Sequence, residues 1–212
     1  MLLIGMFDSP FVRRVAITLK LLELPFEHAK WSVGKDFERI REYNPLGRVP
    51  TLVLANGEAL FESGAILDHL DELVGPERAL IPAAGADRRR ALNILALSTG
   101  AADKGVLQVY EGVFRPENKR HEPWLDRLRL QMNASLAVLD RLVGERGAGQ
   151  WLVGNRLSQA DITAACIFTF LNDTLGVARD AVMFHSLATL AARCEAQPAF
   201  AETRTPFFTP GR

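Results

Sequence analysis

Residues 1–75 alternate short apolar runs with amphipathic segments. The two longest segments, 11–22 and 63–74, carry apolar residues at helical spacing, and a shorter polar helix is expected at 36–43. Four apolar runs, at residues 2–6, 26–31, 51–54 and 59–61, have the length of strands. The predicted order is therefore β-α-β-α-β-β-α, a mixed four-stranded sheet with helices packed on it.

Two features of this part predict how its strands pair. The helix between the first two strands is a crossover, which predicts a parallel, right-handed unit. Asn56-Gly57 between the last two strands is a strong signal for a tight hairpin, which predicts an antiparallel pair.

The rest of the chain carries only helical patterns. The run from Gly75 to Gly85 is rich in proline and glycine and suits a linker. Long helices are expected at residues 87–114, 123–146, 158–175 and 181–196. The expected fold class is an α+β N-terminal domain followed by an all-α helical bundle. The boundaries are 1–78 for the first domain, 79–86 for the linker and 87–212 for the second.

The start of the third long helix has the pattern of a capping box. Ser158 can cap the helix, Asp161 can reach back to the backbone, and Leu157 can pack on Ile162. We interpret this motif as a folding device for the apolar helix that follows, and not as a site of chemistry.

Composition narrows the class of protein. Of the 212 residues 48% are hydrophobic, which excludes a disordered chain, and 25 basic residues balance 25 acidic ones. A net charge of zero argues against nucleic acid or an anionic membrane as the main partner. No apolar run approaches transmembrane length, and the N-terminus lacks a signal-peptide pattern. The two cysteines lack metal or disulfide spacing, so we expect a soluble protein of a reducing, cytoplasmic compartment.

The candidate chemistry lies where strands meet helices in the first domain. The Val49-Pro50 step enters a strand, and a bend there turns the N–H and C=O of Val49 away from the sheet and toward a ligand. Glu62-Ser63 opens a helix whose free N–H groups can bind a carboxylate. Ser9 precedes Pro10 at another helix start, where it can cap the helix, donate to an anion, or do both. A site for an extended, peptide-like anion follows.

In this order, and ahead of an all-helical half, these motifs resemble those of the cytosolic glutathione transferases over essentially the whole chain. The matching segments are Ser9–Arg14, Asn44–Pro50, Glu62–Ile66 and the Ser158–Asp161 helix start. The resemblance implies a thioredoxin-like N-terminal domain and glutathione as co-substrate, with no metal.

The resemblance also implies roles for particular residues. Val49, next to a cis Pro50, would pair through its main chain with the cysteinyl part of glutathione. Glu62 and Ser63 would hold the α-amine and α-carboxylate of its γ-glutamyl end. Lys35 would hold the glycyl carboxylate, although a solvated lysine beside acidic neighbours explains the sequence equally well.

Departures from the family pattern point to a serine-type member. Phe7 stands where tyrosine-type members carry their catalytic hydroxyl, and Ser9 stands where omega- and beta-like members carry a cysteine. Ser9 would therefore stabilise the glutathione thiolate. The chain also lacks the serine-rich run of the zeta class, which counts against maleylacetoacetate isomerase chemistry. Arg13 and Arg14 could tune the thiolate, but we expect them, like Arg48, on a solvated face.

The electrophile is expected to lie against the helical half, and five aromatic residues are candidates to line its apolar pocket. These are Phe7, Tyr110, Phe114 and the tail Phe207-Phe208, although most aromatic residues in helical domains are core. The four histidines show no ligand spacing, and Cys166 on its apolar helix is expected to be inert core.

The expected function is conjugation of glutathione to a small hydrophobic electrophile by a homodimeric enzyme. A glutathione-dependent isomerase, dehalogenase or peroxidase would use the same site. A non-catalytic interaction module of the same fold remains the alternative from another class.

Overall fold

The computed structural model describes residues 1–178 and 183–207. Four short strands form the N-terminal sheet, in the order β2-β1-β3-β4. Their bounds are β1 Leu2–Ile4, β2 Glu27–Ala29, β3 Thr51–Val53 and β4 Ala59–Phe61. β1 pairs with β2 in parallel and β3 pairs with β4 antiparallel, so both pairings expected from the sequence are confirmed.

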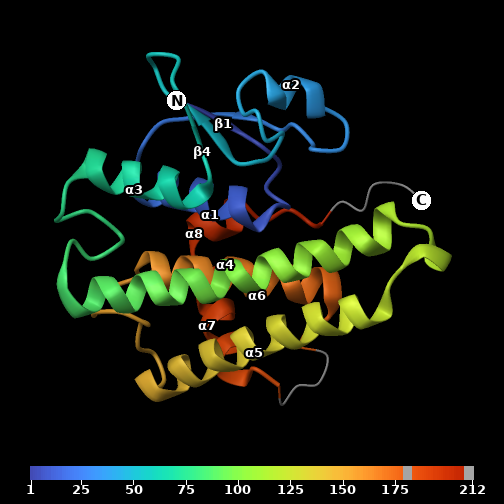
Figure 1. Cartoon of the computed structure of the whole chain (residues 1–212). Coiled ribbons are helices and arrows are strands. Elements are labelled where there is room, and N and C mark those ends of the chain that lie inside the picture. Colours follow the sequence, from blue (N-terminus) through green and yellow to red (C-terminus); the bar gives the residue numbers. More distant parts are fainter. Residues whose placement is uncertain (179–182, 208–212) are drawn as a thin grey trace.

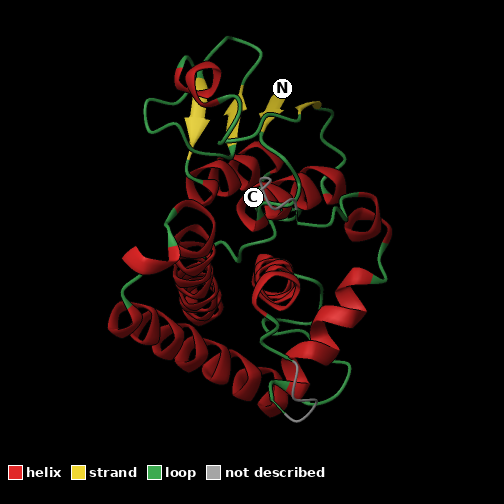
Figure 2. Ribbon diagram, turned by 90° about the vertical axis from the view of Figure 1, so that its right-hand side faces the viewer, coloured by secondary structure: helices red, strands yellow, loops and turns green. Residues whose placement is uncertain are grey.

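Helices cover both faces of this sheet. Helices α1 (Pro10–Leu21) and α3 (Ser63–Val74) lie between the sheet and the helical domain, and α2 (Phe37–Arg41) lies on the outer side (Figures 1 and 2). Leu3 and Leu52 of the sheet pack with Val15 and Ile66 of these helices in one apolar core. This is the α+β N-terminal domain that the sequence predicts.

The second half is entirely helical in the residues described. Its elements are α4 Gly85–Phe114, a 3₁₀ turn η1 Glu117–Lys119, α5 Glu122–Arg146, α6 Gln159–Leu175, α7 His185–Glu195 and α8 Pro198–Glu202. The expected start of the fourth long helix at residues 181–182 lies outside the described residues. The short helix α8 was not predicted, because one turn is too short to show a helical period.

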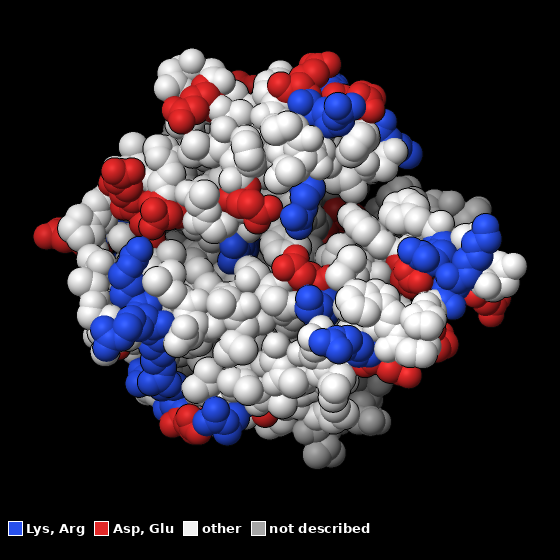
Figure 3. Space-filling view, in the orientation of Figure 1, with Lys and Arg blue, Asp and Glu red and all other residues white. Residues whose placement is uncertain are grey.

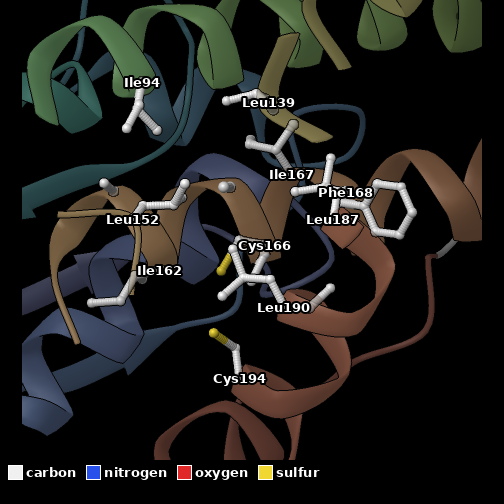
Figure 4. Packing of buried hydrophobic residues seen from close by; sticks show 14 of the residues in the cluster. Ile94, Leu139, Leu152, Ile162, Cys166, Ile167, Phe168, Leu187, Leu190 and Cys194 are labelled. Atoms are coloured by element: carbon white, nitrogen blue, oxygen red, sulfur yellow. The ribbon is translucent and has the colours of Figure 1, made fainter. Parts of the chain in front are cut away.

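Helix α6 forms the centre of the helical domain. All its residues from Gln159 to Leu171 are buried, and α1, α4 and α7 pack against it. Figure 4 shows Cys166 of α6 and Cys194 of α7 among aliphatic side chains. Both cysteines are free thiols, and burial raises the pKa of Cys166 to about 12, so it stays protonated at neutral pH. The interpretation of Cys166 as inert core is confirmed.

The capping box at the start of α6 is also confirmed. Asp161 is fully buried and accepts hydrogen bonds from Ser158 N (2.9 Å), Ser158 Oγ (2.7 Å) and Leu152 N (2.8 Å). The contact with Leu152 is additional to the motif, and it fastens the preceding loop to the helix start.

Among the described residues, no helix is long and apolar enough to cross a membrane.

Candidate functional site

Three segments that are distant in the sequence meet at one end of the strands, where the end of β1, the start of β3 and the end of β4 lie side by side. They are the β1–α1 loop with Ser9, the Arg48–Pro50 segment before β3, and Glu62-Ser63 at the start of α3. Gly5 makes the approach of the first two possible, because its φ of +127° and missing side chain leave room for Val49. A Cβ on Gly5 would lie 2.8 Å from the Val49 Cβ.

Ser9 is the N-cap of α1. Its Oγ accepts a long hydrogen bond of 3.5 Å from Val12 N, and its side chain is half-buried. The hydroxyl hydrogen is not used in this contact, so it can donate to an anion at the positive end of the helix. Capping and anion binding are therefore compatible at this residue.

The Val49-Pro50 peptide bond is cis, as expected. The Asn44 side chain holds the preceding loop by donating from Nδ2 to Arg48 O (2.9 Å) and accepting from Leu46 N (3.0 Å). Within residues 1–178 and 183–207, the N–H and C=O of Val49 have no hydrogen-bond partner. Both groups are thus available to an extended ligand.

Arg14 is placed differently from the sequence expectation. Instead of facing solvent it is 3% exposed, and it donates from Nε (3.1 Å) and Nη2 (2.7 Å) to the Oγ of buried Ser63. Its Nη1 donates to Thr163 Oγ1 (3.3 Å). The prediction of a solvated face for Arg14 is wrong, because α1 is buried on two sides, by the sheet and by α6.

Arg13 is also buried, at 4% exposure, so the same prediction is wrong for it. It makes a two-pronged ion pair with Glu195 of α7, at 2.7 and 2.6 Å, and donates to Phe200 O (2.9 Å). This arginine joins the two domains, while its neighbour Arg14 faces Ser63.

The charge on Arg14 has no carboxylate in hydrogen-bond contact among the described residues. Burial lowers its pKa from 12.5 to about 10, and the charges of Glu62 and of Asp103 on α4 partly offset this. Arg14 therefore stays a cation at neutral pH, held behind a serine hydroxyl at a helix N-terminus. Such a position attracts an anion.

The remaining polar candidates are exposed. Glu62 has a φ of +70° and lies 3.6 Å from Arg48 Nη1, with both side chains more than half exposed. The solvated position expected for Arg48 is confirmed. Lys35 lies in the exposed turn before α2. Figure 3 shows that the surface is hollowed between the N-terminal domain and α4, with acidic and basic residues around the hollow.

The aromatic candidates fall into two groups. Phe7 and Phe207 line a small cavity beside the β1–α1 loop. Tyr110 and Phe114 are exposed on α4, and their rings meet edge to face with centroids 5.2 Å apart. Neither residue lines this cavity or the larger one described below. Phe208 lies outside the described residues.

His28 is a neighbour of the site that the sequence did not reveal. Its ring stacks on Phe7 at 3.8 Å and its Nε2 lies 2.7 Å from Gly5 O. It therefore supports the loop that carries Ser9. Among the described residues no histidine, cysteine or acidic group is clustered in a way that could hold a metal ion.

Comparison with known proteins identifies the family. Residues 3–78 match the model of the glutathione S-transferase N-terminal domain, and residues 122–183 match that of its C-terminal domain. The chain is 33% identical to the uncharacterized GST-like protein YibF of Escherichia coli over 172 residues, 81% of this chain and 82% of the relative. The chain belongs to the glutathione S-transferase family.

Other members show how widely the family varies. A probable maleylacetoacetate isomerase of Vibrio cholerae is 30% identical over 95% of this chain and 94% of its own. The crystal structure of a glutathione S-transferase from Methylobacterium radiotolerans, in complex with glutathione sulfonate, superposes with a TM-score of 0.87. It is 32% identical and covers 95% of this chain and 93% of its own. The thioredoxin-like domain and helical domain expected for this family are thus both present.

Proposed function

We propose that this transferase-family protein binds glutathione and joins its sulfur to a small hydrophobic electrophile. The observation that carries the proposal is the buried cation of Arg14 behind Ser63, which has no carboxylate in hydrogen-bond contact among the described residues. A protein that had no anion to bind at this point would have little reason to bury a charge there, because burial of an unpaired charge is costly.

The γ-glutamyl carboxylate fits the start of α3. Two N–H groups of Arg14 already occupy the Ser63 oxygen, so the Ser63 hydroxyl hydrogen is left to donate to the carboxylate. Glu62 would take the α-amine in place of Arg48, and the free main chain of Val49 would pair with the cysteinyl residue. Lys35 would reach the glycyl carboxylate, or would remain solvated.

Ser9 is the proposed catalytic residue. A thiol with a pKa near 8.5 is mostly protonated at neutral pH, whereas the thiolate is the nucleophile. A hydroxyl donor and a helix N-terminus both stabilise the thiolate. The thiolate sulfur then bonds to the electrophilic carbon, and the leaving group departs with its electron pair.

The test compares Ser9→Ala with Ser9→Thr, which keeps a hydroxyl and a capping oxygen. Ultraviolet absorbance of bound glutathione, titrated against pH, should show a thiol pKa raised by about 1–2 in Ser9→Ala and little change in Ser9→Thr. Turnover at neutral pH should fall accordingly. Unchanged turnover in Ser9→Ala would remove this serine from the mechanism.

Glutathione-dependent isomerisation is the second candidate function. Similarity to the probable maleylacetoacetate isomerase over nearly the whole chain favours it, although the serine-rich run of the zeta class is missing here. A panel with cis-diketo acids, haloalkanes and peroxides would separate isomerase, dehalogenase and peroxidase activities from conjugation. Bound glutathione that forms no thiolate would instead indicate a non-catalytic module.

A cytoplasmic homodimer remains our expectation for the assembly and its location. Sedimentation velocity at micromolar concentration tests the assembly, and a monomer there would contradict it.

A further inference from the structure

A cavity of about 630 Å³ lies in the helical domain, between the C-terminal halves of α4 and α6 and the chain that follows α8. Asp173, Arg204 and Phe207 line both this cavity and the small one that Phe7 and Asp8 line beside Ser9. The larger space therefore adjoins the small cavity beside the β1–α1 loop, and its volume is that of a small-molecule site.

The walls of this cavity are mostly apolar. The apolar side chains are Val109, Val113, Leu175, Pro206 and Phe207. They suit the hydrocarbon body of a ligand, since contact with such a body removes apolar surface from water.

The charged residues of the lining do not cancel. Arg204 Nη1 lies 2.6 Å from Asp173 Oδ2, so these two charges compensate each other. Arg120 is the third charged lining residue, and it has no acidic partner within the described part of the chain. One positive charge in the lining, on a partly exposed side chain, is left uncompensated.

Arg120 is also held in place. Its Nη2 donates to Gly112 O (2.8 Å) and its Nε donates to Arg115 O (3.3 Å), both near the end of α4. Its Nη1 makes no hydrogen bond within the described part of the chain. Two neutral carbonyls fix the guanidinium without neutralising it, so it can receive an anionic group at little cost in conformational entropy.

We propose that this cavity binds an apolar organic carboxylate with Arg120 as its counter-ion, and that the electrophile of the enzyme belongs to this class. The second half rests on the proposed glutathione transfer, whereas the first half stands without it. Arg120 is then a specificity residue, and the carboxylate turns the reactive end of the molecule toward the small cavity beside the β1–α1 loop that carries Ser9.

The test uses a matched pair of electrophiles, 4-(bromomethyl)benzoate and its methyl ester. In both, the glutathione sulfur bonds to the benzylic carbon and bromide leaves with the electron pair of the broken bond. Each rate is divided by its uncatalysed rate, which removes the difference in intrinsic reactivity. The readout is the acid-to-ester ratio of kcat/KM.

Arg120→Gln removes the charge and keeps an amide donor, while Arg120→Lys keeps the charge. Arg115→Gln is the matched control, because Arg115 lies at the same helix end and pairs with Glu111 at 3.0 Å, but its side chain does not line the cavity. A hydrogen bond between a guanidinium and a carboxylate contributes enough binding free energy that its loss in Arg120→Gln should lower the acid-to-ester ratio about tenfold or more. It should fall less in Arg120→Lys and stay unchanged in Arg115→Gln.

A second measurement is independent of catalysis. Saturation-transfer NMR with the unreactive 4-methylbenzoate should detect binding to the wild type and a clear loss in Arg120→Gln. If 4-methylbenzoate binding depends on Arg120 but glutathione is transferred to neither bromomethyl compound, the carboxylate site is upheld and the proposed function is refuted.

Two results would overturn the proposal. One is an acid-to-ester ratio that is the same in wild type and Arg120→Gln, even if thermal unfolding shows that the variant is less stable. In that case Arg120 would have only a structural role, as a donor to the last carbonyls of α4. The other is 4-methylbenzoate binding that is absent, or equal in the two proteins.

Discussion

Replacing Arg14 with methionine separates the effect of its buried charge on folding stability from the contribution of that charge to glutathione binding. Methionine has a similar length and no charge, so the packing between α1 and α6 is largely kept. A structural role and a binding role for Arg14 predict different results for this one substitution.

The expected change in stability is small, because two large contributions oppose each other. Burial lowers the pKa of Arg14 from 12.5 to about 10. At about 1.4 kcal/mol for each pH unit, the buried charge costs about 3 kcal/mol of folding free energy. This cost is present in full at neutral pH, because both the folded and unfolded states are protonated below the folded pKa.

Methionine removes this cost, and it also removes the hydrogen bonds to Ser63 and Thr163. Losing bonds from a charged donor to two hydroxyl groups costs about 2–4 kcal/mol. The free energy of unfolding in urea should therefore change by less than about 2 kcal/mol. Glutathione affinity, measured by calorimetry, should fall about tenfold to a hundredfold because the carboxylate loses a buried cation.

Arg13→Met is the matched control. Arg13 is equally buried and lies on the same turn, but it pairs with Glu195 and not with Ser63. Its loss leaves a partly buried carboxylate uncompensated, so stability should fall by about 3 kcal/mol or more. Glutathione affinity should change by less than about threefold. Wild-type affinity in Arg14→Met together with a large loss of stability would refute the binding role.

Three further predictions concern the framework of the site. Asp161→Ala leaves buried N–H donors without an acceptor and should lower the free energy of unfolding by about 3 kcal/mol in urea titration, with KM for glutathione little changed. Gly5→Ala should lower both stability and glutathione affinity, because a Cβ 2.8 Å from that of Val49 forces the two segments apart; tight glutathione binding in this variant would contradict the packing argument. Burial lowers the pKa of His28 in the folded protein, so the unfolded state takes up its proton first, and stability should fall as the pH drops below about 6.5. His28→Phe, which can still stack on Phe7, should weaken this acid dependence, as pH-resolved thermal unfolding can measure.

The sequence by itself determined most of the architecture. Apolar periodicity located the long helices to within a few residues, and Asn56-Gly57 and the first crossover predicted two of the three strand pairings. The cis Val49-Pro50 bond and the capping box of α6 were confirmed as well. The helix positions, the predicted pairings and the capping box depend on local preferences and on period, which a single chain displays directly, whereas the cis bond was expected from the family resemblance.

Only the tertiary structure decided the electrostatics of the candidate site. In the sequence, Arg13 and Arg14 are two charged residues on an amphipathic helix, and period alone assigns them to solvent. Because α1 is covered by the sheet on one side and α6 on the other, both are buried. One then pairs with Glu195 and the other faces Ser63, a difference that depends on contacts over more than 45 residues of sequence.

The cavity near Arg120 is a second feature that folding alone decided. Its walls come from α4, α6 and the chain after α8, with Arg120 from the loop before α5. No local pattern links residues so far apart, because a cavity is the space left by packing and not a property of any segment. The net charge of the lining also depends on the fold, because Arg204 pairs with Asp173 whereas Arg120 contacts only main-chain carbonyls in the described residues.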